Sequence, residues 1–315
     1  MSRTLDWPSL DYGEWAETLA TVRLWAQMIG KVRLAHEPWL NHSWHVPLYL
    51  SARGLTTTLV NADRHPFELE LDLIDHQLRL STSDGGVSGF ALAPMSVATF
   101  HRRLAETLRG SGVDPTFDGR PNEIPDAVPF AEDEEHAAYD RAAVERYWRA
   151  LLTIDRLFKR FRTGFIGKTS PVHLFWGSFD LAVTRFSGRP APLHPGGVPG
   201  LPDRVAREAY DHEVSSAGFW PGDPANPAAA FYSYAYPAPA GFADARVRPA
   251  AAIFSAELGE WFLPYEAVRS ADDPESMLFA FLEDTFHAAA KLAKWDRSLE
   301  TAYGAPGQVR EPNPA

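Results

Sequence analysis

The stretch Ser170–Arg189 constrains the fold of this chain more than any other segment. Apolar residues fill most of it, so it is predicted as one long buried strand. It also carries four side chains that can hydrogen-bond or hold charge: His173, Trp176, Asp180 and Arg185. Polar groups inside a sheet must find partners or take part in chemistry. Residues 43–57 weakly resemble this stretch. Both segments follow a helical pattern and end in an arginine near a glycine, which predicts an internal duplication.

Bulk properties narrow the class of protein. The 315 residues can bury a large core, in one bilobal domain or in two domains. The net charge of −11 argues against nucleic-acid binding and against an anionic membrane surface. The absence of cysteine excludes disulfides and thiolate sites. We find no signal-peptide core and no run of about 18 apolar residues, so we expect a cytoplasmic protein, and the bias toward Arg, Ala and Pro is typical of a GC-rich bacterial genome.

Periodicity predicts helices and antiparallel strands. Helices are expected at residues 14–33, 94–109, 141–161 and 274–295. Asp11 is expected to cap the first of them and Asp273 the last. Strands are expected at residues 44–59, 171–187, 231–236 and 250–263, with a hairpin over 67–82. The order of elements repeats, which predicts an α+β fold of two pseudo-repeated halves, each of antiparallel strands packed with helices.

Composition sets the expected boundaries. A first α+β half is predicted over residues 1–119, an acidic Pro-rich linker over 120–138, a second half over 139–304 and a loose tail over 305–315. Within the second half, Gly and Pro mark residues 188–230 as an inserted loop. We interpret the acidic run Glu132–Glu135 as a solvated face rather than as a cation site.

Three segments carry a resemblance to a known family: Trp44–Thr56, Pro171–Arg189 and Glu213–Gly222. Through them the chain resembles an uncharacterised bacterial protein family, domain of unknown function 5996, over residues 7–304. The resemblance implies membership of that family. It implies no reaction, and no residue role follows from it.

Strand parity gives the first group of candidate site residues. His45 shares a strand face with Arg53, as does His173 with Arg185, because residues of equal parity lie on one face. If the two halves pair about a pseudo-twofold axis, these side chains would supply an acid–base group and an anion clamp. The alternative is that His173 is a core histidine bonded to the backbone, since its predicted face is otherwise apolar.

The expected loop and the next strand add further candidates. His212 beside Glu213 could act as a general base, although a polar surface loop is the alternative. No spacing typical of a zinc site occurs, so no metal and no cofactor are expected. Trp220 and Tyr234 could stack on a ring-shaped ligand, or could simply cover the sheet.

These candidates favour a metal-independent enzyme that acts on a small polar or aromatic molecule through His/carboxylate acid–base chemistry. The catalytic candidates are His173, His212, Glu213 and Asp180, and the ligand-binding candidates are Arg185, His45, Arg53, Trp176, Trp220 and Tyr234. The alternatives are a non-catalytic small-molecule binding protein and a partner-binding protein. A pocket is expected where residues 171–187 meet residues 188–230, and the oligomeric state stays open.

Overall fold

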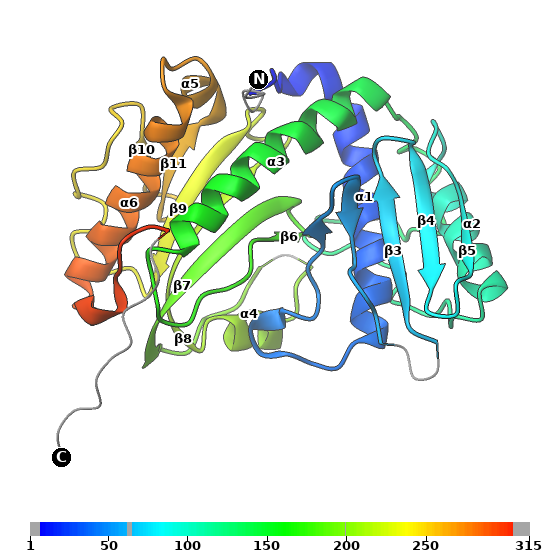
Figure 1. Ribbon diagram of the computed structural model, residues 1–315, viewed down its shortest axis with the longest axis horizontal. Coiled ribbons are helices and arrows are strands. Elements are labelled where there is room, and N and C mark those ends of the chain that lie inside the picture. Colours follow the sequence, from blue (N-terminus) through cyan, green and yellow to red (C-terminus); the bar gives the residue numbers. More distant parts are fainter. Residues whose placement is uncertain (1–6, 62–64, 199, 305–315) are drawn as a thin grey trace.

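The computed structural model describes residues 7–61, 65–198 and 200–304, and the statements below refer to these residues. Within them the chain forms six α-helices and two antiparallel sheets, of five and six strands (Figure 1). The predicted α+β class is confirmed. No helix of the described ranges is long and apolar enough to cross a membrane.

The first sheet follows the chain in order. Its strands are β1 (Tyr49–Leu50), β2 (Gly54–Thr56), β3 (Phe67–Asp72), β4 (Gln77–Thr82) and β5 (Val87–Ala91), paired in that order. The flanking helices are α1 (Tyr12–His36) and α2 (Val97–Gly110), with the 3-10 turn η1 (Asn41–Ser43) between α1 and β1. Both helices pack on one face of the sheet, where alternate strand residues are buried.

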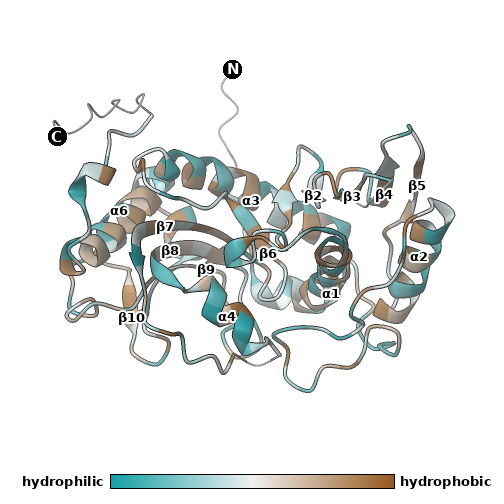
Figure 2. Ribbon diagram, turned by 90° about the horizontal axis from the view of Figure 1, so that it is seen from below, coloured by the Kyte–Doolittle hydropathy of each residue, from teal (hydrophilic) through white to brown (hydrophobic). Residues whose placement is uncertain are grey.

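The second sheet has the order β10-β11-β9-β8-β7-β6. Its strands are β6 (His173–Phe175), β7 (Asp180–Pro190), β8 (His212–Trp220), β9 (Ala230–Tyr236), β10 (Ile253–Ser255) and β11 (Glu260–Pro264). The helices are α3 (Arg141–Arg162), α4 (Asp203–Ala209), α5 (Tyr265–Arg269) and α6 (Pro274–Leu292), followed by η2 (Arg297–Leu299). Figure 2 shows α3 and α6 on one face of this sheet and α4 on the other.

The two sheets meet edge to edge. Leu48 exchanges two backbone hydrogen bonds with Leu174, at 2.9 and 2.8 Å, which joins the β1 edge to the β6 edge. Each sheet is entered from a long helix and followed by another helix, as the predicted repeat requires. The internal duplication itself stays a prediction.

Helix α1 lies between the two sheets (Figure 1). Its residues 24–33 are all buried, because it contacts structure on every side. Three polar side chains spaced four residues apart face the segment that links the two halves. They are Arg23, Gln27 and Lys31, and they bond to residues 118–123 and to the turn after β6.

The four predicted helices and the 67–82 hairpin are confirmed, and Asp11 and Asp273 cap their helices as expected. The long strand predicted over 171–187 is wrong, because the turn Trp176–Phe179 divides it into β6 and β7. Phe179 adopts a left-handed φ of 63° there. Its ring is buried, so the hydropathy pattern runs through the turn unbroken.

Two other segments differ from the prediction for related reasons. The strand predicted over 44–59 is a hairpin of β1 and β2. The Ser51 hydroxyl stabilises its turn by accepting from the amides two and three residues on, those of Arg53 and Gly54. The inserted loop predicted over 188–230 is wrong, because it contains α4 and the central strand β8. Both faces of β8 are buried, so its sequence does not alternate.

Candidate functional site

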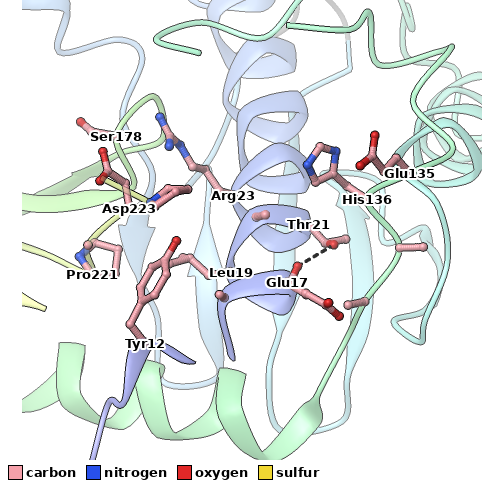
Figure 3. A pocket seen from close by; sticks show the side chains of 16 residues that line it. Tyr12, Glu17, Leu19, Thr21, Arg23, Glu135, His136, Ser178, Pro221 and Asp223 are labelled. Carbon is pink, nitrogen blue, oxygen red and sulfur yellow. Dashed lines mark hydrogen bonds between the residues drawn. The ribbon is translucent and has the colours of Figure 1, made fainter. Parts of the chain in front are cut away.

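A pocket of about 660 Å³ opens between α1, the segment before α3, and the turns that follow β6 and β8 (Figure 3). Polar side chains from all four elements line it: Tyr12, Glu17, Arg23, Glu135, His136, Ser178 and Asp223. Figure 3 shows Arg23, Ser178 and Asp223 together on one wall, with the Tyr12 hydroxyl directed toward them. Concave sites with a few converging polar groups are the usual place for small-molecule binding.

Arg23 connects this wall to the structure behind it. Its Nε donates to the carbonyl of Gly177 at 2.6 Å, and Nη2 donates to the carbonyl of Glu123 at 3.2 Å. Burial lowers the pKa of Arg23, and the charges of Glu123, Asp223 and Asp180 oppose that shift. A half-buried guanidinium therefore faces three carboxylates.

Ser178 bonds to one of these carboxylates. Its hydroxyl donates to Oδ1 of Asp180 at 2.7 Å, and the Glu123 carboxylate lies against the neighbouring Gly177. The Tyr232 hydroxyl donates to Oδ2 of Asp180. Burial raises the pKa of both carboxyls, and the charge of Asp180 raises that of Glu123 further. Both shifts favour the protonated forms of these carboxyls.

Two glycines let these groups approach one another. Tyr232 reaches Asp180 across the intervening strand β8, where its cross-strand neighbour is Gly218. A Cβ on Gly218 would collide with the Tyr232 ring, and one on Gly177 would collide with the Glu123 carboxylate. Because Gly218 has no side chain, the Tyr232 ring can cross β8. Because Gly177 has none, the Glu123 carboxylate can lie against the turn after β6.

The polar row continues along the same sheet face. The rings of Tyr232 and Tyr234 stack at 6.1 Å, and the Tyr234 hydroxyl lies 2.8 Å from that of Tyr210. Burial raises the pKa of Glu260 to about 7, with the charge of Asp180 adding to the effect. Clusters of carboxyls with shifted pKa values are typical of functional sites.

The raised pKa of Glu260 predicts a pH-dependent stability difference. The folded-state value lies above the ordinary 4.5, so wild-type protein loses stability as pH rises through about 7. Glu260→Gln should match wild type at pH 5 and be more stable by about 2 kcal/mol at pH 8.5. Urea unfolding at the two pH values measures this. The exposed Glu257→Gln is the control, and an equal response in both variants would contradict the prediction.

Among the four predicted catalytic residues, Asp180 lies at this site. His173 is 1% exposed and is enclosed by the rings of Trp44, Tyr49 and Phe175. Burial, followed by the charges of Arg33 and Arg162, lowers the pKa of His173 to about 3, so its ring is neutral near pH 7. It does not line the pocket.

His212 and Glu213 lie at the start of β8, at the far end of that strand from Trp220. The Nδ1 of His212 is 2.7 Å from Oδ1 of Asp211, and Glu213 pairs with Arg189 at 2.6 Å. Neither lines the pocket, so the expected grouping of loop and strand residues does not occur there. The expected segment 188–230 contributes residues 221–224 instead.

The predicted ligand-binding residues are dispersed. Arg185 is buried among phenylalanine rings, and Arg53 pairs with Asp72 and Asp75. His45 is buried and accepts from the Leu40 amide at 3.2 Å. The His/Arg convergence predicted from parity is therefore not formed.

The aromatic candidates have structural contacts of their own. Trp176 packs on Gly30 of α1 and donates to the Val46 carbonyl at 3.0 Å. Trp220 ends β8 next to the pocket residue Pro221, and Tyr234 belongs to the buried polar row described above.

One group of side chains has the composition of a metal site: His42, Asp211 and His212, with ligand atoms within 4.8 Å of one another. Both ring nitrogens of His42 are engaged, however. Lys168 can only donate, so its contact requires Nε2 to accept, and Nδ1 then carries the proton toward the Ala209 carbonyl at 3.1 Å. His42 in this arrangement offers no lone pair to a metal. The absence of a bound metal stays a prediction.

Most residues of the pocket are not among the predicted site residues. Arg23 is one of them, a single polar position within the stripe of helix α1. Glu123 and Asp223 lie in Pro- and Gly-rich turns, where polarity is ordinary. A charged residue on an apolar helix face was the available signal, because such a group needs a partner.

The fold and the pocket define an α+β protein of two joined antiparallel sheets, with a polar pocket next to the buried carboxyl of Asp180 and the half-buried carboxyl of Glu123. The chain belongs to the family of unknown function DUF5996, whose model matches residues 7–301. The resemblance noted from the sequence is thereby confirmed. Neither a search of the curated proteins nor a search of the solved structures found a match to this chain.

Proposed function

We propose that this protein is a metal-independent enzyme that performs acid–base chemistry on a small polar molecule held in the pocket. The observation that supports it is Ser178, which lines the pocket and whose hydroxyl donates to the buried carboxylate of Asp180. A raised carboxyl pKa suits proton transfer near neutral pH, because catalytic groups work best with pKa values near the operating pH.

The roles follow from the contacts. Asp180, held by Ser178 and Tyr232, is proposed as the base, and Glu123 as the acid that keeps the proton. Ser178 would pass a proton between the pair and the substrate, since it can donate and accept at once. Arg23 would offset part of the negative charge that the pair gains when one proton leaves. In this proposal the carboxyls of Asp180 and Glu123 have the acid–base role that was predicted for His173 and His212.

Replacing Asp180 by asparagine tests this proposal. The change keeps the size of the side chain but removes the base, so turnover should fall roughly 100-fold. Wild type and Asp180→Asn are each incubated with a small-molecule extract of the source cells, and compounds consumed by wild type alone are sought by mass spectrometry. Glu257→Gln serves as the active control, and circular dichroism confirms folding. Equal metabolite profiles for wild type and Asp180→Asn would contradict an enzymatic role.

The alternative is a non-catalytic small-molecule binding protein. Asp180 itself does not line the pocket, and Ser178 is its connection to it. A compound that co-purifies unchanged with both variants would favour this alternative. A cytoplasmic bacterial setting and the absence of a nucleic-acid partner belong to the same proposal, and the net charge of −11 supports the latter.

A further inference from the structure

The charges around the pocket indicate what kind of molecule it accepts. Its lining carries three carboxylates, those of Glu17, Glu135 and Asp223, and one guanidinium, that of Arg23. The guanidinium is already bonded to two backbone carbonyls and attracted by the carboxylates behind it. An anionic ligand would therefore meet net repulsion, whereas a cation would be attracted.

Asp223 is the carboxylate held most firmly. Its Oδ1 accepts from the Asn226 amide at 2.7 Å, and its own amide donates to the Asn226 carbonyl at 3.1 Å. Gly222, with φ of 91°, permits this tight turn. The Oδ2 of Asp223 has no hydrogen-bond partner within the described ranges of the chain, and Figure 3 shows the side chain on the wall with Arg23 and Ser178.

Apolar groups surround these charges. Leu19 and Ala20 of α1 line the pocket, as do Pro221 and Pro224, and the Tyr12 ring lies below Asp223 in Figure 3. An aromatic ring beside carboxylates is a favourable surface for an ammonium group and its adjoining carbon atoms.

We propose that the pocket binds a small organic ammonium ion with a short apolar or aromatic body, its ammonium group hydrogen-bonded to Asp223. The inference rests on the proposed function in taking this pocket as the substrate site. It goes further by naming the substrate class.

Binding of a cation should also expel a proton. Burial raises the pKa of Asp180 and Glu123, and a positive charge nearby favours their ionised forms, so a proton held by either carboxyl becomes easier to lose. Calorimetric titrations in two buffers of different ionisation enthalpy would report this release. A matched compound without the charge should release none.

Isothermal titration calorimetry on the full chain with three matched probes tests the proposal. The probes are 2-phenylethylamine, 2-phenylethanol and 3-phenylpropionate, which share a ring and differ in charge. We expect the amine to bind most tightly, and Asp223→Asn to weaken it about 10-fold or more, as for loss of a charged hydrogen bond. Asp244→Asn, at an exposed position outside the pocket, should bind like wild type.

Several outcomes would overturn the assignment. Tighter binding of 3-phenylpropionate would make Arg23 the recognition group, and equal binding of the alcohol and the amine would make charge irrelevant. Unchanged amine affinity in Asp223→Asn, or no amine binding at all, would also refute it. Because the readout is binding, amine binding without turnover would uphold this inference while the enzymatic proposal fails.

Discussion

Replacing Arg185 by alanine is expected to destabilise the fold by about 3–5 kcal/mol, as for truncation of a large buried side chain. Arg185 is 1% exposed, and its guanidinium lies 3.6 Å from the centre of the Phe161 ring and 4.2 Å from that of Phe286. It donates to the Phe161 carbonyl, in the last turn of α3, where a cation is favourable. Urea unfolding followed by circular dichroism measures the loss.

Arg185→Met separates packing from charge. Burial lowers the pKa of Arg185 to about 10, which shows that the interior penalises the charged form. An apolar side chain of similar length avoids that penalty, so Arg185→Met should cost less than about 1.5 kcal/mol. If the alanine variant unfolds at the same urea concentration as wild type, or if methionine is as damaging as alanine, the core role is refuted.

A methyl group added at Gly30 is expected to destabilise the protein by about 2–3 kcal/mol, as for overpacking of a tight core. Gly30 lies in the fully buried part of α1, and a Cβ there would collide with the Trp176 indole. Displacing the indole would also break its hydrogen bond to the Val46 carbonyl, which ties the turn after β6 to the segment before β1. Thermal and urea unfolding of Gly30→Ala give the cost.

Gly110→Ala is the matched control, since it is also a helical glycine changed to alanine. No atom lies within 4 Å of a Cβ at Gly110, so the better helix propensity of alanine should leave stability unchanged or raise it by less than about 1 kcal/mol. Similar melting of both variants would mean that the Trp176 contact is not tight.

Much of the architecture could be predicted from the sequence because amphipathic helices leave a clear trace. The stripe of α6 begins at Asp273 and Pro274 in both the prediction and the structure. The alternating hairpin of β3 and β4 was equally readable. The errors fall in two kinds of segment. Strand β8 is buried on both faces, and the turn at Phe179 contains a buried aromatic ring, so in neither place does the hydrophobic pattern mark where a strand begins or ends.

The candidate site was less predictable, because it depends on contacts between residues far apart in sequence. Asp180 was identified since a carboxylate inside an apolar stretch needs a partner. Its partners Ser178 and Tyr232 fall within the predicted strands 171–187 and 231–236. Strand parity cannot bring them to Asp180, because the turn Trp176–Phe179 is not visible in the pattern. Glu123 belongs to a segment whose composition indicates only a linker, and nothing local shows that it docks on α1.

The pocket draws its lining from three separate parts of the chain. Arg23 comes from α1, Glu135 from the segment before α3, and Ser178 and Asp223 from the turns after β6 and β8. A fragment that ends within the linking segment would therefore lack part of the pocket wall. A chimaera that takes its second half from a relative would have to keep the contacts of Arg23 with Gly177 and Glu123 that join these parts.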